Sequence, residues 1–303
     1  MVPAKVLVGM GGWDLPPFNR RFYPFPKPKD FSKLEFYSRY FDLVEVNSTF
    51  YNPRWDPAII RRWLTDVSGN KNFLFTVKLY RGFTHERIAT QGDLRSIHEI
   101  LDLLVAEGKL GGLVIQLPFS FTCTADRRRH LEKISRAFRD YTMFIEVRHD
   151  SWNSPDIDVF FREHSLHQIN IDLPPLKHYM PLTSVAWDGV SYFRMMGRNS
   201  ATWTQATKGA IEENGSRYNY LYNQDELDQL LKLIQGVRNN TKRVFVVFHN
   251  DPNAHSLVNG FQIRKHLKQP VSVPPSLTRI YPQLGSPSVI REEGLPLFEE
   301  RQK

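Results

Sequence analysis

The sequence has little cysteine and no long apolar segment. Its single cysteine, Cys123, excludes a framework of internal disulfides and fits a reducing compartment. No apolar run approaches the roughly 20 residues that a membrane-spanning helix needs. The first residues show no charged segment followed by an apolar one, so we expect no signal peptide. The expected location is the cytoplasm, with no membrane partner.

Positive charge is what the chain has in excess. Lys and Arg number 40 against 32 Asp and Glu, which gives a net charge of +8. Such a balance favours an anionic partner, and nucleic acid is one candidate. The basic residues are spread over short groups rather than one long run, as on an ordinary solvated surface. Charge alone therefore leaves nucleic-acid binding open.

Along the chain, apolar segments with the alternation of β-strands are followed by segments with the periodicity of helices, and this order repeats. This order predicts a parallel sheet with helical crossovers. Eight such units match a closed (β/α)8 barrel. An open doubly wound sheet would need a glycine-rich turn leading into a helix, and Gly9-Met10-Gly11-Gly12 lacks the third spaced glycine. We predict an α/β fold with strands at residues 6–10, 43–46, 73–78, 113–117, 143–148, 168–172, 190–195 and 244–248.

The barrel is expected to occupy residues 1–268 as a single TIM-barrel-like domain, followed by an extended, Pro-containing tail over 269–303. The tail carries six prolines in 35 residues and no sustained periodicity. Within it, residues 294–298 (Gly-Leu-Pro-Leu-Phe) are similar to a short sliding-clamp-binding peptide, with glycine replacing the leading glutamine. The alternative is that Leu297 and Phe298 pin the tail to the barrel.

Polar side chains share one face in most of the expected strands. In the segment 143–148, Glu146 and Arg148 share a face and Ile145 and Val147 take the other. Apolar faces suit packing against outer helices, so the polar faces are expected to point into the barrel. Sites in this fold lie at the C-terminal mouth. That mouth would hold three acids and three bases: Glu45, Lys78, Glu146, Arg148, Asp172 and Arg194.

These residues suggest roles in a catalytic site. Glu45 and Glu146 would transfer protons, because a shared site would split their pKa values. Two further catalytic candidates are Asp172 and His149, of which His149 reaches the rim only if its strand ends at Arg148. Guanidinium and ammonium groups suit phosphate or carboxylate binding. The expected substrate-binding residues are Lys78, Arg148 and Arg194 for the anion, Asn47, Gln116 and Asn250 for positioning, and the aromatic Trp13 and Tyr51 for the cleft wall.

Two other interpretations of the mouth stay open. The charges could form a satisfied ion-pair network that plugs the barrel. A divalent metal bound by Glu45, Glu146, Asp172 and a histidine is conceivable. However, no His-x-x-x-His or Glu-x-x-His spacing supports it, so we assign no metal ligand and no cofactor.

Several strand-end segments together resemble a known family. They include Gly9-Met10-Gly11-Gly12-Trp13, the Val-Glu-Val-Asn-Ser-Thr-Phe-Tyr run at 44–51, and Glu146-Val147-Arg148-His149. These segments resemble the YecE-like family, also called domain of unknown function 72, over about residues 6–267. The resemblance implies a TIM-barrel-like fold and supplies no activity. His249 stands where the resemblance leads us to expect asparagine.

The sequence therefore predicts an enzyme that acts on an anionic (phosphorylated or carboxylated) or sugar-like small molecule by acid–base chemistry at the C-terminal mouth. The alternative is a nucleic-acid-associated protein that uses its basic surface, with or without the clamp-binding-like tail.

Overall fold

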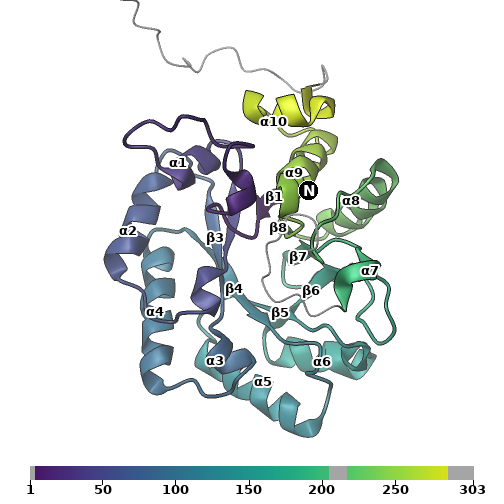
Figure 1. The fold of residues 1–303 in the computed structure, drawn as a ribbon. Coiled ribbons are helices and arrows are strands. Elements are labelled where there is room, and N and C mark those ends of the chain that lie inside the picture. Colours follow the sequence, from purple (N-terminus) through teal and green to yellow (C-terminus); the bar gives the residue numbers. More distant parts are fainter. Residues whose placement is uncertain (1–3, 205–216, 286–303) are drawn as a thin grey trace, which may run out of the picture.

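The structure, a computed structural model, describes residues 4–204 and 217–285. Its strands close into a parallel barrel in which neighbours follow chain order and the first strand pairs with the last (Figure 1). This confirms the predicted α/β TIM-barrel-like fold. The strands are β1 (Lys5–Met10), β2 (Leu43–Val46), β3 (Leu74–Lys78), β4 (Leu110–Gln116), β5 (Met143–Glu146), β6 (Leu166–Asp172), β7 (Val190–Met195) and β8 (Arg243–Phe248).

Helices surround the barrel on its outer side (Figure 1). Side-chain caps mark where several of them begin. Thr90 and Asp93 form a reciprocal capping box at the start of the longest helix. The helices are α1 (Lys33–Ser38), α2 (Pro57–Asp66), α3 (Arg81–Thr84), α4 (Gln91–Ala106), α5 (Ala125–Ala137), α6 (Pro155–Glu163), α7 (Ser200–Trp203), α8 (Gln224–Arg238), α9 (His255–His266) and α10 (Pro275–Ile280).

The barrel interior has an apolar layer below its charged mouth. Phe144, Tyr192 and Phe245 pack together there, with ring centroids 4.8 to 5.6 Å apart. Such aromatic packing fills the barrel centre with large buried surface. Phe144 and Tyr192 each lie two residues before a charged strand-end residue, Glu146 and Arg194. The charged groups therefore sit on a packed floor rather than over a water-filled pore.

The connection between β6 and β7 is the one crossover that lacks a helix, and all of its residues, 173–189, are described. It covers the outer face of β6. Asn170 on that face donates to Val185 O (3.0 Å) and accepts from Val185 N (2.7 Å) and from the Thr183 hydroxyl (2.7 Å). The loop thus satisfies the hydrogen bonds of a polar side chain on the outer face of the barrel. A helix packed at the same place would have required an apolar side chain there.

The first part of the predicted tail folds onto the domain. After α9 the chain forms α10 and a 3-10 turn at Pro282–Gly285, with Leu277 and Leu284 buried. Tyr281 donates its hydroxyl to Asn253 O at 2.7 Å. Figure 1 shows α10 beside the end of α9. An extended conformation was therefore wrong for these residues, and the clamp-like segment 294–298 lies outside the described residues.

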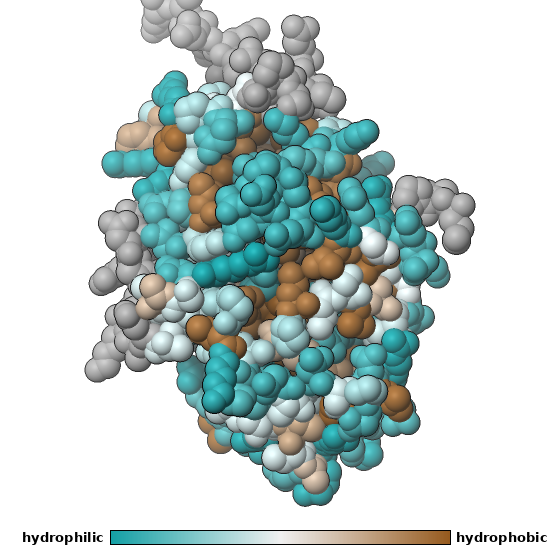
Figure 2. Space-filling view, turned by 90° about the vertical axis from the view of Figure 1, so that its right-hand side faces the viewer, coloured by the Kyte–Doolittle hydropathy of each residue, from teal (hydrophilic) through white to brown (hydrophobic). Residues whose placement is uncertain are grey.

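The outer surface is mainly hydrophilic. On the face seen in Figure 2, apolar residues appear in recessed bands between hydrophilic ones. Within the described ranges, no helix has both the length and the apolar character that crossing a bilayer requires.

Candidate functional site

Arg194, near the end of β7, lies at the centre of the barrel mouth and is almost completely buried. Its Nη2 donates to Glu45 Oε1 at 2.6 Å, and its Nη1 donates to Gln116 Oε1 at 2.9 Å and to Glu146 Oε2. Its Nε donates to His249 Nε2 at 3.0 Å. We call Glu45, Gln116, Glu146, Arg194 and His249 the mouth cluster. Side chains from five separate segments thus meet at one guanidinium.

The register of the strands explains this meeting. Gln116 pairs with Glu146 across β4 and β5, and Glu45 pairs with Thr76 across β2 and β3. Residues that pair in a parallel sheet point to the same side, so these groups all face inward. The second oxygen of Glu45 accepts from the Tyr192 hydroxyl at 2.8 Å.

Both carboxyls of the mouth cluster are held in the ionised form. Burial alone would raise the pKa of Glu45, but Arg194 and His249 keep it well below its usual range. Burial would likewise raise the pKa of Glu146, and Arg194 with Arg148 lowers it. The expectation that a shared site would split the two pKa values was wrong. The cause is that the guanidinium lies between the acids and favours the charge on each.

Lys78 at the end of β3 is a buried cation of a different kind. Its side chain is only 8% exposed, and its Nζ lies 4.1 Å from the centroid of the Phe50 ring. No described residue accepts a hydrogen bond or forms an ion pair with that nitrogen. Burial and the nearby Arg194 lower the pKa of Lys78 to about 7, against the opposite effect of Glu45 and Glu146. The amine is therefore partly neutral near pH 7.

Arg148 follows β5 and has spare hydrogen-bonding capacity. Its Nε donates to Glu146 Oε1 at 2.7 Å, and its side chain is 12% exposed. Neither Nη atom has an acceptor within residues 4–204 and 217–285. His85 lies nearby, edge-on to Phe50 at 5.0 Å. Burial, Lys78 and Arg148 lower the pKa of His85 to about 4, so its imidazole is neutral.

Asn47 and the aromatic candidates lie around the rim. The Asn47 amide donates to Gly11 O at 2.5 Å, and its buried Oδ1 has no partner in the described part of the chain. Tyr51 is 69% exposed and packs edge-on against Phe50, with centroids 5.0 Å apart. Trp13 instead packs edge-on against Trp63 of α2 at 5.1 Å, so it is tied to the outer layer.

Two predicted site residues do not face the mouth. Ile171 pairs with Arg194, which places Asp172 on the outer side of β6. There it accepts two-pronged hydrogen bonds from Arg198 at 2.9–3.0 Å and one from the Tyr222 hydroxyl at 2.6 Å. Asp172 is therefore an outer ion-pair residue, and the prediction that it joins the mouth was wrong.

Asn250 also does not face the mouth, again because side chains alternate between the two faces of a strand. Val247 of β8 pairs with Arg194, so His249 continues the inward face and Asn250 points away. The Asn250 amide donates to Tyr220 O and to Asn259 Oδ1, both at 2.8 Å. Its role is to join β8 to α9 and a neighbouring loop. The sequence analysis placed Asn250 at the mouth, whereas the inward face of β8 leads to the residue before it, His249.

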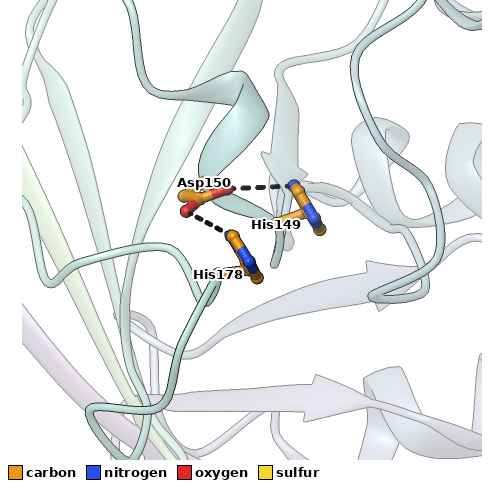
Figure 3. Close-up of side chains that lie close together, drawn as sticks. All are labelled: His149, Asp150 and His178. Carbon is orange, nitrogen blue, oxygen red and sulfur yellow. Dashed lines mark hydrogen bonds and ion pairs between the residues drawn. The ribbon is translucent and has the colours of Figure 1, made fainter.

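His149 belongs to a separate group at the rim, which we call the rim trio: His149, Asp150 and His178 (Figure 3). β5 ends at Glu146, and His149 caps the 3-10 turn Asp150–Trp152. Asp150 offers one oxygen to each Nδ1, at 3.2 Å for His149 and 3.3 Å for His178. The two rings are parallel, 5.8 Å apart.

The rim trio is also where the described residues offer ligand atoms for a metal, all within 4.8 Å of one another. The metal set considered from the sequence is not assembled, because Glu45 and Glu146 bind Arg194 while Asp172 faces outward. Backbone pairing positions the rim trio, with Asp150 N donating to His178 O at 3.0 Å.

Sequence reasoning assigned no role to three groups near the mouth. His249 contacts both Glu45 and Arg194, and Tyr192 supports Glu45 from below. Asp251 is the third: burial raises its pKa to about 7, and its Oδ1 has no partner in the described ranges. The signal for His249 and Asp251 was weak because β8, which precedes them, is apolar on both faces, so alternation could not set its parity.

Comparison with known proteins matches residues 7–281 to a family model described as protein of unknown function DUF72. The UPF0759 protein YunF of Bacillus subtilis (strain 168) is 28% identical over 274 residues, covering 85% of this chain and 93% of that protein. A DUF72 family protein from Thermotoga maritima MSB8 superposes with a TM-score of 0.73 at 26% identity, covering 87% of this chain and 99% of the other. Another, from Enterococcus faecalis V583, gives 0.76 at 23% identity, covering 89% and 98%.

Proposed function

The chain belongs to the DUF72 family, and from that premise and the barrel mouth we propose that it is an enzyme acting on a small anionic substrate by acid–base chemistry. The substrate class is a phosphorylated or carboxylated compound, or a sugar derivative that carries such a group. The observation that carries the proposal is that Arg148, whose Nη atoms have no acceptor in the described part of the chain, shares the mouth with Lys78, whose Nζ has no acceptor there either.

Arg148 supports anion binding because, among residues 4–204 and 217–285, part of its donor fork has no acceptor. Glu146 fixes the guanidinium through Nε, which leaves both Nη groups for a bidentate contact with phosphate or carboxylate. Arg194, expected from the sequence to share this role, has acceptors on Nε and on both Nη atoms and is buried. We therefore assign it the positioning of Glu45 and Glu146, and Arg148 remains as the anion-binding group.

Proton transfer is assigned to Lys78 rather than to the two glutamates. A general base works best when its pKa lies near the working pH, and Lys78 meets that condition. Glu45 and Glu146 stay ionised, so they do not donate protons at neutral pH. Their charge instead stabilises a positive charge that develops on Lys78.

The rim residues support a ring-shaped substrate. Tyr51 exposes most of its ring beside Phe50, whose face covers Lys78. Aromatic faces of this kind pack against sugar or base rings.

The test is phosphate binding by isothermal titration calorimetry, with inorganic phosphate as the probe. Replacing Arg148 with Ala should weaken binding by about 10- to 100-fold, because a charge-assisted hydrogen bond is worth about 1.5–3 kcal/mol. Arg39→Ala is the matched control, since Arg39 forms an exposed pair with Glu35.

Circular dichroism must show that Arg148→Ala is folded, because Glu146 loses a donor. Arg148→Lys, which keeps the charge but loses the fork, should show a smaller loss. Equal phosphate affinity in wild type, Arg148→Ala and Arg39→Ala would show that the anion site is elsewhere or absent.

A further inference from the structure

We propose that Lys78 is a covalent catalytic residue whose Nζ forms an imine with the carbonyl carbon of the substrate. The substrate class then narrows to an aldehyde or ketone that carries a phosphate or carboxylate group. This inference rests on the proposed function, because the anionic group is the part that Arg148 holds.

The geometry around Lys78 supports a nucleophile rather than a structural cation. Lys78 ends β3, pairs with Val114 and so faces inward, and its carbonyl accepts from the Thr49 hydroxyl at 2.7 Å. The backbone is therefore fixed, while the side chain, 8% exposed, brings its amine to the Phe50 ring, and the amine lacks an acceptor among the described residues. Burying an ammonium without an acceptor is costly. A structural role would have called for a paired charge, as Arg194 has.

The surrounding charges favour a neutral amine. Arg194 and Arg148 both disfavour the ammonium, and the glutamates that favour it are already engaged by Arg194. With a pKa of about 7, about half of the Lys78 side chains are neutral at pH 7. An unperturbed lysine has a neutral fraction of only about 0.04% at that pH. The supply of nucleophile is therefore higher at Lys78 than at an exposed lysine, and desolvated lysines are activated in this way.

The proposed step balances without any further reactant. The Nζ lone pair attacks the carbonyl carbon, the C–N bond forms, and the carbonyl π electrons move to oxygen, which takes up a proton. The nitrogen gives up one proton as this carbinolamine forms and its second proton as the hydroxyl is protonated and leaves as water. The product is an imine, so one amine and one carbonyl give one imine and one water with no change in oxidation state. Protonation of the imine then creates a cation next to Glu45 and Glu146, whose charges stabilise it.

Competitive labelling of the full chain tests this inference. The protein is treated at pH 7 with limiting formaldehyde, and separately with dihydroxyacetone phosphate, each in the presence of cyanoborohydride to reduce the imine. Peptide mass spectrometry then gives the rate at every lysine. Formaldehyde should modify Lys78 at least about 10-fold faster than the surface lysines, allowing for slower access to a buried amine. The Lys78 rate should rise with pH around a midpoint near 7.

Lys109 supplies the matched control, because it is partly buried but donates to Asn70 O at 2.8 Å. Lys109→Arg should leave labelling of Lys78 unchanged, whereas Lys78→Arg should remove the fast site. Inorganic phosphate should slow labelling by dihydroxyacetone phosphate.

Lys78 labelling no faster than that of Lys109 and the surface lysines would overturn the inference. If phosphate binding still depends on Arg148 in that case, the result supports the proposed anion site and refutes only the covalent step. If Lys78 is labelled fast but phosphate binding does not depend on Arg148, the result refutes the proposed anion site instead.

Discussion

Removal of the central guanidinium should be far more damaging than the loss of an ordinary ion pair. Arg194→Met keeps an unbranched side chain but leaves Glu45 and Glu146, both fully buried, without their main partner. Breaking a buried pair by removing one partner costs about 3–5 kcal/mol. Whole domains are stable by only about 5–15 kcal/mol, so this single change consumes a large share of the folding free energy.

The pH dependence of that loss follows from the sign of the pKa shifts. In the wild type both glutamate pKa values are lowered, so they add stability above about pH 4.3, the unfolded value, and lose it as the pH falls further. Without Arg194, burial dominates and raises the pKa of each glutamate above the unfolded value. The buried carboxylate charges then destabilise the variant at neutral pH, and this loss of stability becomes smaller as the pH falls. The gap between wild type and Arg194→Met should therefore narrow from pH 7 to pH 5.

Urea unfolding followed by circular dichroism at pH 5, 6 and 7 measures both effects. The control is Arg39→Met, which removes an exposed pair with Glu35 and should change the free energy of unfolding by at most about 0.5 kcal/mol. If Arg194→Met costs less than about 1 kcal/mol at pH 7, or its deficit is the same at all three pH values, the buried acids do not depend on this guanidinium.

Two more predictions concern neighbours of the mouth cluster. Burial raises the pKa of Asp251 to about 7, so the wild type should lose stability as the pH rises from about 4 to 7, by at most about 1.4 kcal/mol per pH unit. Asp251→Asn should remove this pH dependence of the unfolding free energy, as measured by urea unfolding. Gly11→Ala should lower stability by about 1–3 kcal/mol in thermal unfolding, since its methyl carbon would lie 2.2 Å from Nδ1 of His249. His249→Ala in the Gly11→Ala background should recover part of that loss, and no recovery would place the strain elsewhere.

The sequence was informative where a strand has one polar and one apolar face. In β2, β3, β5 and β7 the alternation correctly placed Glu45, Lys78, Glu146 and Arg194 inside the barrel. The fold itself was predictable because strands and helices alternate in the regular order that parallel barrels need.

The errors came from partners that no local pattern reveals. Asp172 is polar yet faces outward, because Arg198 and a loop tyrosine satisfy it there. β8 is apolar on both faces, so its inward residue His249 gave no signal and Asn250 was chosen instead. The pKa values of the two glutamates were misjudged because Arg194 comes to lie between them only through tertiary packing, which local sequence patterns do not show. Nucleic-acid binding stays a prediction of the overall charge.

The claim on which the proposals most depend is that Lys78 is a near-neutral amine at the barrel mouth. It is tested directly by titrating the ¹³Cε and ¹⁵Nζ resonances of Lys78 in protein made with labelled lysine, with Lys78→Arg giving the assignment. We predict a midpoint near pH 7, far below that of the surface lysines. A midpoint near the unperturbed value of about 10.4 would contradict the account.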